Sequence, residues 1–156
     1  MPIVTVGTNS YISIEDADEA LDERYMTDDW FQLDDDNKAR LLIMATRQID
    51  RLPCKYDSAT EEQTLRYPIV LSDGTTPAGL EHAQEAVLEQ AWYMFRNYEN
   101  IQGAQDQSIN NIRSENLGAI QTAKSNAGFN PFKLYAPEAL RLMSEFTDFK
   151  MKISRG

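Results

Sequence analysis

Apolar residues recur at helical spacing in four parts of the chain, and each part predicts a helix. The first helix is predicted from Ile14 to Tyr25, because Ser13 followed by Asp16 has the pattern of an N-cap. The second is predicted to begin at 34–36 and to end before Pro53, since proline cannot continue a helix interior. The apolar faces of these two helices consist of Ile14, Ala17, Leu21 and Tyr25 and of Ala39, Leu42, Ile43, Thr46 and Ile49.

Proline opens the other two predicted helices, as is common at the first helical position. The third helix is predicted from about Pro77 to Asn97, and the last from Pro137 to about 149. Their apolar stripes consist of Leu80, Ala83, Val87, Ala91 and Met94 and of Leu140, Met143, Phe146 and Phe149. Residues 26–33 connect the first two helices, and we expect the pair Trp30 and Phe31 to fill the gap between them.

The remaining segments lack helical periodicity. Residues 54–79 are expected to be irregular, with one or two helical turns where Thr60 and Gln63 have the spacing of a capping box. The step from Tyr67 to Pro68 is expected to be extended. A polar loop at 100–110 precedes a weak β-hairpin predicted at 112–122, with its turn at 116–118.

These patterns predict a mainly α fold. We expect a small bundle of about four helices with a short β-hairpin and a C-terminal helix and tail arm. A chain of 156 residues with 42% hydrophobic residues fits one domain with a real core. Within it, residues 1–100 form the helical core, 101–136 the loop and hairpin, and 137–156 the last helix and basic tail. No apolar run approaches the roughly 20 residues that span a bilayer, and no signal peptide is visible.

The formal net charge of −10 is unevenly distributed along the chain. Residues 1–40 hold eleven acids against three bases, whereas the other 116 residues hold 14 acids and 12 bases. The last seven residues contain Lys150, Lys152 and Arg155 and no acid. We therefore expect the N-terminal face to repel nucleic acid, because nucleic-acid-binding domains usually carry a basic patch and no clear one is present.

No residue pattern indicates catalysis or metal binding. The run 34–36 lacks the spacing of a calcium loop and is expected to cap a helix. His82 is the only histidine, so a paired-histidine zinc site is not expected, and Cys54 is expected to be a free thiol. No Gly-x-Ser-x-Gly elbow or phosphate loop is present. We expect neither a cofactor nor a metal, and we predict that the protein is not an enzyme.

Two aromatic segments leave alternatives open. Trp92, Tyr93, Phe95 and Tyr98, with Arg96 between them, could form a base-stacking platform of the kind seen in single-strand binders. Such a platform normally comes with a cationic groove, so core packing is the favoured interpretation. In the last segment, apolar residues alternate with charge, and this helix either docks on its own core or enters a partner's groove. The residues of that pattern are Phe146, Phe149, Lys150, Met151, Lys152 and Ile153.

The order of motifs resembles that of the tailed-bacteriophage head-to-tail adaptor proteins, also called head-completion or connector proteins. The similar features are an opener with Gly7 and Ser13-x-x-Asp16-Ala17-Asp18, a Leu-rich helix at 41–52, and the Tyr67–Pro68 step. The proline-started helix at 77–91, a hairpin at 114–118 and Pro137-x-Ala139-Leu140 follow in the same order.

The resemblance implies a structural virion protein in the neck between capsid and tail, assembled in the host cytoplasm. Such adaptors form a ring, commonly dodecameric, beneath the portal protein. The ring extends the channel for double-stranded DNA, which passes without specific binding, and it docks the stopper or tail; no membrane is involved. Implied portal-binding residues are Leu140, Met143, Phe146, Phe149, Lys150, Lys152 and Arg155. Implied inter-subunit or tail-facing hairpin residues are Arg113, Glu115, Asn116, Leu117 and Gly118.

An alternative interpretation belongs to another class of protein. The sequence also looks loosely like primosomal, DnaT-like single-stranded DNA-binding accessory proteins. The acidic first forty residues argue against this alternative, and tight binding to oligonucleotides at low salt would favour it.

Overall fold

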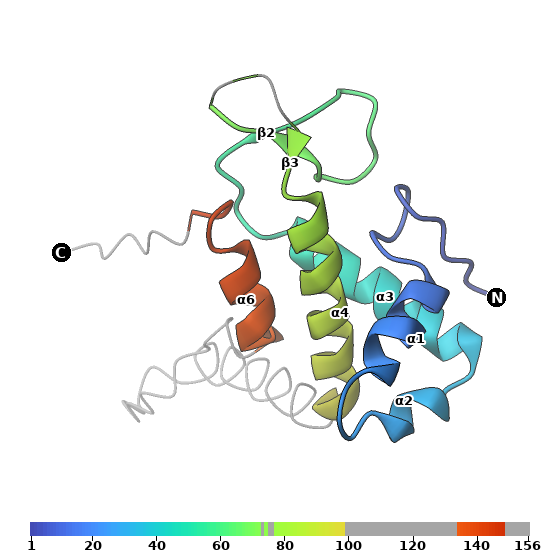
Figure 1. The fold of residues 1–156 in the computed structure, drawn as a ribbon. Coiled ribbons are helices and arrows are strands. Elements are labelled where there is room, and N and C mark those ends of the chain that lie inside the picture. Colours follow the sequence, from blue (N-terminus) through green and yellow to red (C-terminus); the bar gives the residue numbers. More distant parts are fainter. Residues whose placement is uncertain (73, 75–76, 99–133, 149–156) are drawn as a thin grey trace, which may run out of the picture.

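The computed structural model describes the chain except for residues 73, 75–76, 99–133 and 149–156 (Figure 1). The described residues form five helices: α1 (Ile14–Asp22), α2 (Asp28–Phe31), α3 (Asp35–Asp50), α4 (Leu80–Arg96) and α6 (Pro137–Met143). A small antiparallel sheet has the strand order β1 (Asp57–Ser58), β2 (Ile69–Val70) and β3 (Pro77–Ala78). The predicted fold class, mainly α with a short hairpin, is confirmed. The hairpin expected at 112–122 lies outside the described residues.

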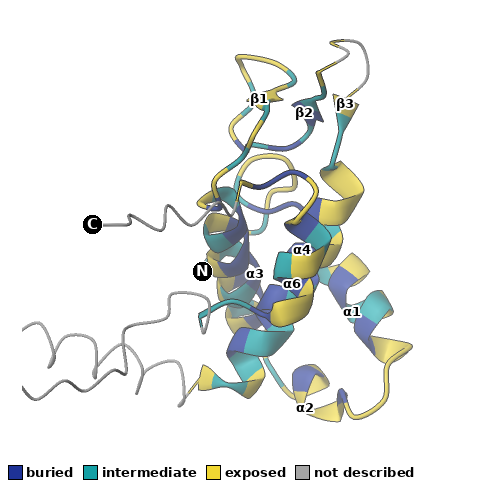
Figure 2. Cartoon of the chain, turned by 90° about the vertical axis from the view of Figure 1, so that its left-hand side faces the viewer, coloured by how far each residue is buried: buried dark blue, intermediate teal, exposed yellow. Residues whose placement is uncertain are grey.

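Helix α4 is the centre of the bundle. It packs against α3 on one side and α6 on the other, and the small sheet lies at its N-terminal end (Figure 1). Buried residues gather where these helices face one another, whereas the chain around β1 is mostly exposed (Figure 2). Largest among the fully buried side chains are Trp30, Tyr11, Leu21, Leu42, Ile49, Ile69 and Met143.

Both predicted N-caps are present. The Ser13 hydroxyl accepts a hydrogen bond from the Asp16 amide at 3.0 Å, and the Asp34 carboxylate accepts one from the Asn37 amide at 2.8 Å. Helix α1 ends at Asp22, three residues earlier than predicted. The reason is a tight turn in which the Thr27 hydroxyl donates to the Leu21 and Arg24 carbonyls at 2.7 and 3.0 Å.

That early ending changes the place of two aromatic residues. Tyr25 is 92% exposed instead of completing the apolar face of α1. Of the pair in α2, Trp30 is fully buried and its indole N–H donates to Asp18 at 2.7 Å, while Phe31 is 41% exposed. Asp18 also pairs with the buried Lys38 at 2.8 Å. Trp30 alone therefore fills the gap between α1 and α3.

The predicted start of the third helix at Pro77 is wrong. Pro77 belongs to β3, which pairs with β2, and Gly79 is the N-cap of α4 with φ of +83°. Proline is tolerated there because β3 is an edge strand of the sheet. Glycine is required next because its left-handed backbone is costly for other residues and a Cβ would lie 3.0 Å from the Tyr67 ring.

The capping-box pattern at Thr60 and Gln63 forms its hydrogen bond but no helical turn follows. The Gln63 side-chain oxygen accepts from the Thr60 amide at 3.0 Å. Its NH₂ group donates to the carbonyls of Leu65, Arg66 and Pro68 at 2.7–3.0 Å. The Gln63 amide thus closes the loop between β1 and β2. Its hydrogen bonds hold an irregular loop and do not cap a helix.

A buried polar cluster ties the N-terminal segment to α3. The Tyr11 hydroxyl donates to the Asp50 carboxylate and accepts from the Tyr67 amide at 2.9 Å. Asp50 also accepts from the Arg66 amide at 3.3 Å. Burial raises the pKa of the Asp50 carboxyl and of the Tyr11 hydroxyl.

The last helix docks on the protein's own core. Helix α6 ends at Met143 instead of continuing to 149, and Met143 and Phe146 are buried. The chain after it pairs with the segment that follows α3: the Lys55 amide donates to the Phe146 carbonyl at 3.0 Å, and the Asp148 amide to the Pro53 carbonyl at 2.9 Å. These backbone hydrogen bonds compete with continued helix, which explains its early end.

Candidate functional site

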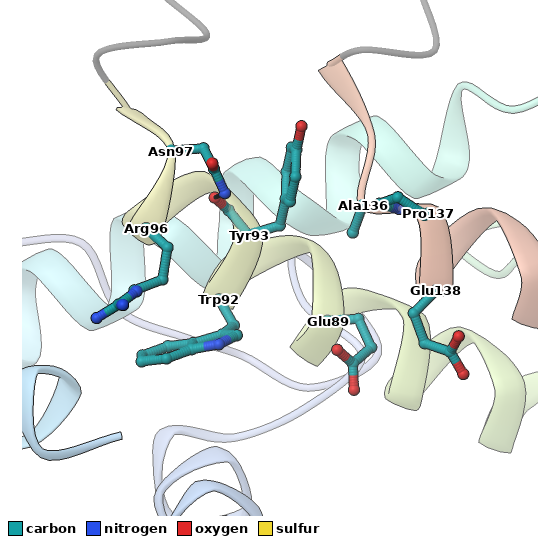
Figure 3. A pocket seen from close by; sticks show the side chains of 8 residues that line it. All are labelled: Glu89, Trp92, Tyr93, Arg96, Asn97, Ala136, Pro137 and Glu138. Carbon is teal, nitrogen blue, oxygen red and sulfur yellow. Dashed lines mark hydrogen bonds between the residues drawn. The ribbon is translucent and has the colours of Figure 1, made fainter. Parts of the chain in front are cut away.

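A cavity of about 440 Å³ lies between the C-terminal half of α4 and the start of α6 (Figure 3). The residues that form one wall lie at helical spacing, so they share a single face of α4. The other wall is the start of α6. The lining residues are Glu89, Trp92, Tyr93, Arg96 and Asn97 on the first wall and Ala136, Pro137 and Glu138 on the second.

Gln90 holds the two walls together. Its side chain is fully buried. The side-chain oxygen accepts a hydrogen bond from the Ala136 amide at 2.7 Å, and the NH₂ group donates to the Leu134 carbonyl at 2.9 Å and to the Gln48 side chain. Because every polar atom of this amide has a partner, residues 134–136 are fixed against α4 immediately before α6 begins.

Trp92 provides a flat aromatic surface on the α4 wall. The ring is half-buried, and the Arg96 guanidinium carbon lies 5.4 Å from its centre. Phe95 supports it from the core side: its ring centre lies 5.8 Å from that of Trp92 and 6.3 Å from that of the buried Trp30. The chain of rings braces Trp92 while leaving part of it accessible.

Ion pairs balance the charge around the cavity. Arg24 pairs with Glu89 at 2.7 Å, and Arg96 pairs with Asp29 at 3.1 Å. Arg141 pairs with Glu138, and this hydrogen-bonded guanidinium lowers the pKa of the Glu138 carboxyl. Each of these three carboxylates thus has an arginine partner. Their negative charges are balanced, although the chain as a whole has a net negative charge.

The comparison with known families adds a decisive finding. A family model described as "Putative DnaT-like ssDNA binding protein" matches residues 2–156. The chain belongs to this family. No curated protein and no solved structure matches the chain.

Membership of the DnaT-like family corrects the adaptor interpretation. The family match contradicts the expected function as a head-to-tail adaptor or head-completion protein. The expected partners, namely portal, stopper or tail, a ring of identical subunits and double-stranded DNA in a channel, are corrected with them. The interpretation was wrong because each of its motifs is a local helix or turn signal that many helical proteins share. The expected place in a virion neck stays a prediction.

The structure places only part of the residues assigned to portal binding. Leu140 is half-buried on α6, whereas Met143 and Phe146 lie in the core. The Phe146 ring centre lies 5.2 Å from that of His82 and 6.1 Å from that of Tyr67. Phe149, Lys150, Lys152 and Arg155 lie outside the described residues, as do Arg113, Glu115, Asn116, Leu117 and Gly118.

The other candidate residues have structural surroundings. Cys54 is a half-buried free thiol whose sulfur accepts a hydrogen bond from the Tyr67 hydroxyl at 3.7 Å. In the described part of the chain, no three His, Cys, Asp or Glu side chains are grouped so that they could hold a metal ion. In the same part, no helix combines the length and apolar character needed to cross a membrane.

The aromatic cluster of the sequence divides in two. Trp92, Tyr93 and Arg96 line the cavity, while Phe95 packs between two tryptophans. Sequence reasoning missed the roles of Gln90 and of the residues at 136–138. A glutamine within the apolar stripe of a buried helix was the available signal, because a buried amide needs hydrogen-bond partners.

Proposed function

We propose that this protein binds single-stranded DNA in the cavity between α4 and α6, with Trp92 as the surface on which a base stacks, and that it has no catalytic activity. The description of the family supports the ligand. The observation that supports the place is the half-buried Trp92 ring beside a cavity, braced by Phe95 and overlaid by Arg96.

Stacking can supply binding energy without a basic groove. A base stacked on an aromatic side chain contributes about 1–3 kcal/mol, and every base has the flat face that this needs. Arg96 adds a second planar surface and a positive charge next to the ring. Phe95 keeps the indole in place, so little side-chain entropy is lost when a base binds.

The acidity of the chain shapes this mode of binding. Arg24, Arg96 and Arg141 already pair with carboxylates, so few positive charges of the described residues around the cavity remain to neutralise phosphates. For single strands, the logarithm of the binding constant falls with that of the salt concentration by about 0.7 per neutralised phosphate. We therefore expect a slope of about −1, much shallower than that of a protein with a basic groove.

Tryptophan fluorescence tests the proposal directly. The chain has two tryptophans: Trp30 is fully buried, and Trp92 lines the cavity. Titration with a single-stranded 15-mer at low salt should quench the emission of the wild type, and Trp92→Phe should remove most of that change. An unlabelled duplex of the same length should not compete.

Affinity measurements with a labelled oligonucleotide complete the test. Trp92→Ala should weaken binding by about 5- to 150-fold, the equivalent of one lost stack. Tyr25→Ala is the matched control, because Tyr25 is 92% exposed and outside the cavity lining. The proposed site would be wrong if Trp92→Ala bound as tightly as the control. The proposed function would be wrong if the wild type bound no oligonucleotide at micromolar concentrations.

A further inference from the structure

We infer that the cavity prefers guanine to thymine and that Glu89 is the residue that makes the distinction. This inference rests on the proposed function, since it concerns the base that stacks beside Trp92. Its basis is the position of a carboxylate with free acceptor capacity in the cavity wall.

Glu89 lies next to the stacking surface. It precedes Trp92 by three positions on α4, and both side chains line the same cavity. In the view of Figure 3, the Glu89 carboxylate lies between the Trp92 ring and Glu138. A base that stacks on Trp92 can therefore turn its polar edge toward Glu89.

The two carboxylates of the lining differ in what they can still accept. Arg141 donates from its Nε to both oxygens of Glu138, at 3.0 Å each. Glu89, in contrast, has one ion pair among the described residues, in which its Oε1 lies 2.7 Å from Arg24. Since each carboxylate oxygen can accept two hydrogen bonds, Glu89 can accept from a base without giving up Arg24.

Burial makes this acceptor selective. Only 19% of the Glu89 side chain is exposed, so water competes less for its oxygens and the cost of an unmatched polar group beside it is greater. Arg24 balances its charge, which allows the carboxylate to remain in a partly buried place.

Guanine matches a carboxylate better than the other bases do. Its Watson–Crick edge carries two adjacent donors, N1–H and the N2 amino group, which can reach both oxygens of one carboxylate. Cytosine and adenine each offer an amino group beside an acceptor nitrogen. Thymine offers one N–H between two carbonyl oxygens that a carboxylate repels. Glu89 should therefore favour guanine most and thymine least.

Three oligonucleotides of equal length distinguish hydrogen bonding from stacking: T15, (TTG)5 and (TTI)5, in which inosine replaces guanine. Inosine stacks much like guanine but lacks the N2 amino group. We expect the wild type to bind (TTG)5 about tenfold more tightly than T15. Because inosine keeps N1–H but loses the N2 contact, (TTI)5 should bind more weakly than (TTG)5 and more tightly than T15. Equal affinity for (TTG)5 and (TTI)5 would overturn the inference, because stacking would then explain the preference.

Variants of Glu89 give an independent measurement. Glu89→Gln should reduce the preference for (TTG)5 to about twofold or less, because one acceptor oxygen becomes a donor. Glu85→Gln makes the same change in charge one turn earlier on α4, at an exposed position outside the cavity lining, and should keep the preference.

The outcomes separate this inference from the proposed function. Equal binding of all three oligonucleotides by the wild type, or an unchanged preference in Glu89→Gln, would overturn the inference alone. No binding of any oligonucleotide would overturn the proposed function and the inference with it.

Discussion

The substitution Gln90→Met tests whether one buried amide holds the two walls of the cavity together. Methionine has nearly the same length as glutamine, so the change removes hydrogen bonds without creating a large void. The Ala136 amide loses the acceptor at 2.7 Å and the Leu134 carbonyl loses the donor at 2.9 Å. Ala136 is only 3% exposed, so water cannot easily replace the lost partner.

The size of the effect follows from these contacts. A buried polar group without a partner costs about 1–3 kcal/mol, and the Ala136 amide is the most deeply buried of those left behind. The Gln48 side chain, which accepts from Gln90, also loses a partner. The greater apolar character of methionine offsets part of the loss, about 1 kcal/mol. We expect the free energy of unfolding to fall by about 2–3 kcal/mol, which a domain of ordinary stability survives.

Urea denaturation and oligonucleotide binding should be measured on the same preparations. Gln32→Met is the matched control, because Gln32 is exposed at the end of α2 and its substitution should change stability by less than about 0.5 kcal/mol. Gln90→Met should also weaken binding of single-stranded DNA under conditions in which the variant is folded, since the α6 wall loses its tether. A variant as stable as the control, with unchanged binding, would refute the role assigned to Gln90.

Three further predictions concern the rest of the fold. Burial raises the pKa of Asp50, so the native state binds its proton more readily than the unfolded chain does. The stability of the wild type relative to Asp50→Asn should therefore increase as the pH falls from neutral through the raised pKa toward the ordinary value. Urea denaturation at several pH values measures this, and a constant difference in stability between the two proteins would contradict it. Gly79→Ala should cost about 1–3 kcal/mol, because φ is +83° and the added Cβ would lie 3.0 Å from the Tyr67 ring, and a neutral effect on the melting temperature would contradict this. Phe146→Ala should cost about 3–5 kcal/mol, because Phe146 is 3% exposed in the core; a loss below about 1 kcal/mol in urea would place it at the surface.

Features that depend on neighbours in the chain were predictable from sequence. The caps at Ser13 and Asp34 were expected and are present, because a side chain two or three residues from an amide can reach it in any fold. Helix α3 and the start of α6 at Pro137 follow for the same reason. The mainly α class follows from the number and length of the periodic segments.

Features that depend on distant partners were not predictable. The local sequence around Pro77 fits the start of a helix and an edge strand equally well. The pairing of Ile69 with Ala78 places Pro77 in the strand. Gln63 forms its capping bond yet closes a loop, because three carbonyls of residues 65–68 are within its reach. The amphipathic pattern of the last segment fits a partner's groove as well as it fits the protein's own core. The contacts of the Phe146 ring with Tyr67 and His82 show that Phe146 belongs to the core.

The candidate site shows the same division. The sequence by itself determined that aromatic residues and Arg96 gather at the end of one helix, because that depends only on helical spacing. Tertiary structure decided that Trp92 faces a cavity, since the second wall comes from residues 136–138 and Gln90 holds it in place. Tertiary structure also decided the charge around the cavity, where Glu89 and Glu138 each pair with an arginine. The net charge of −10 does not reveal these pairs, because it is a sum over the sequence, whereas the interaction of two charges depends on their distance in the folded protein.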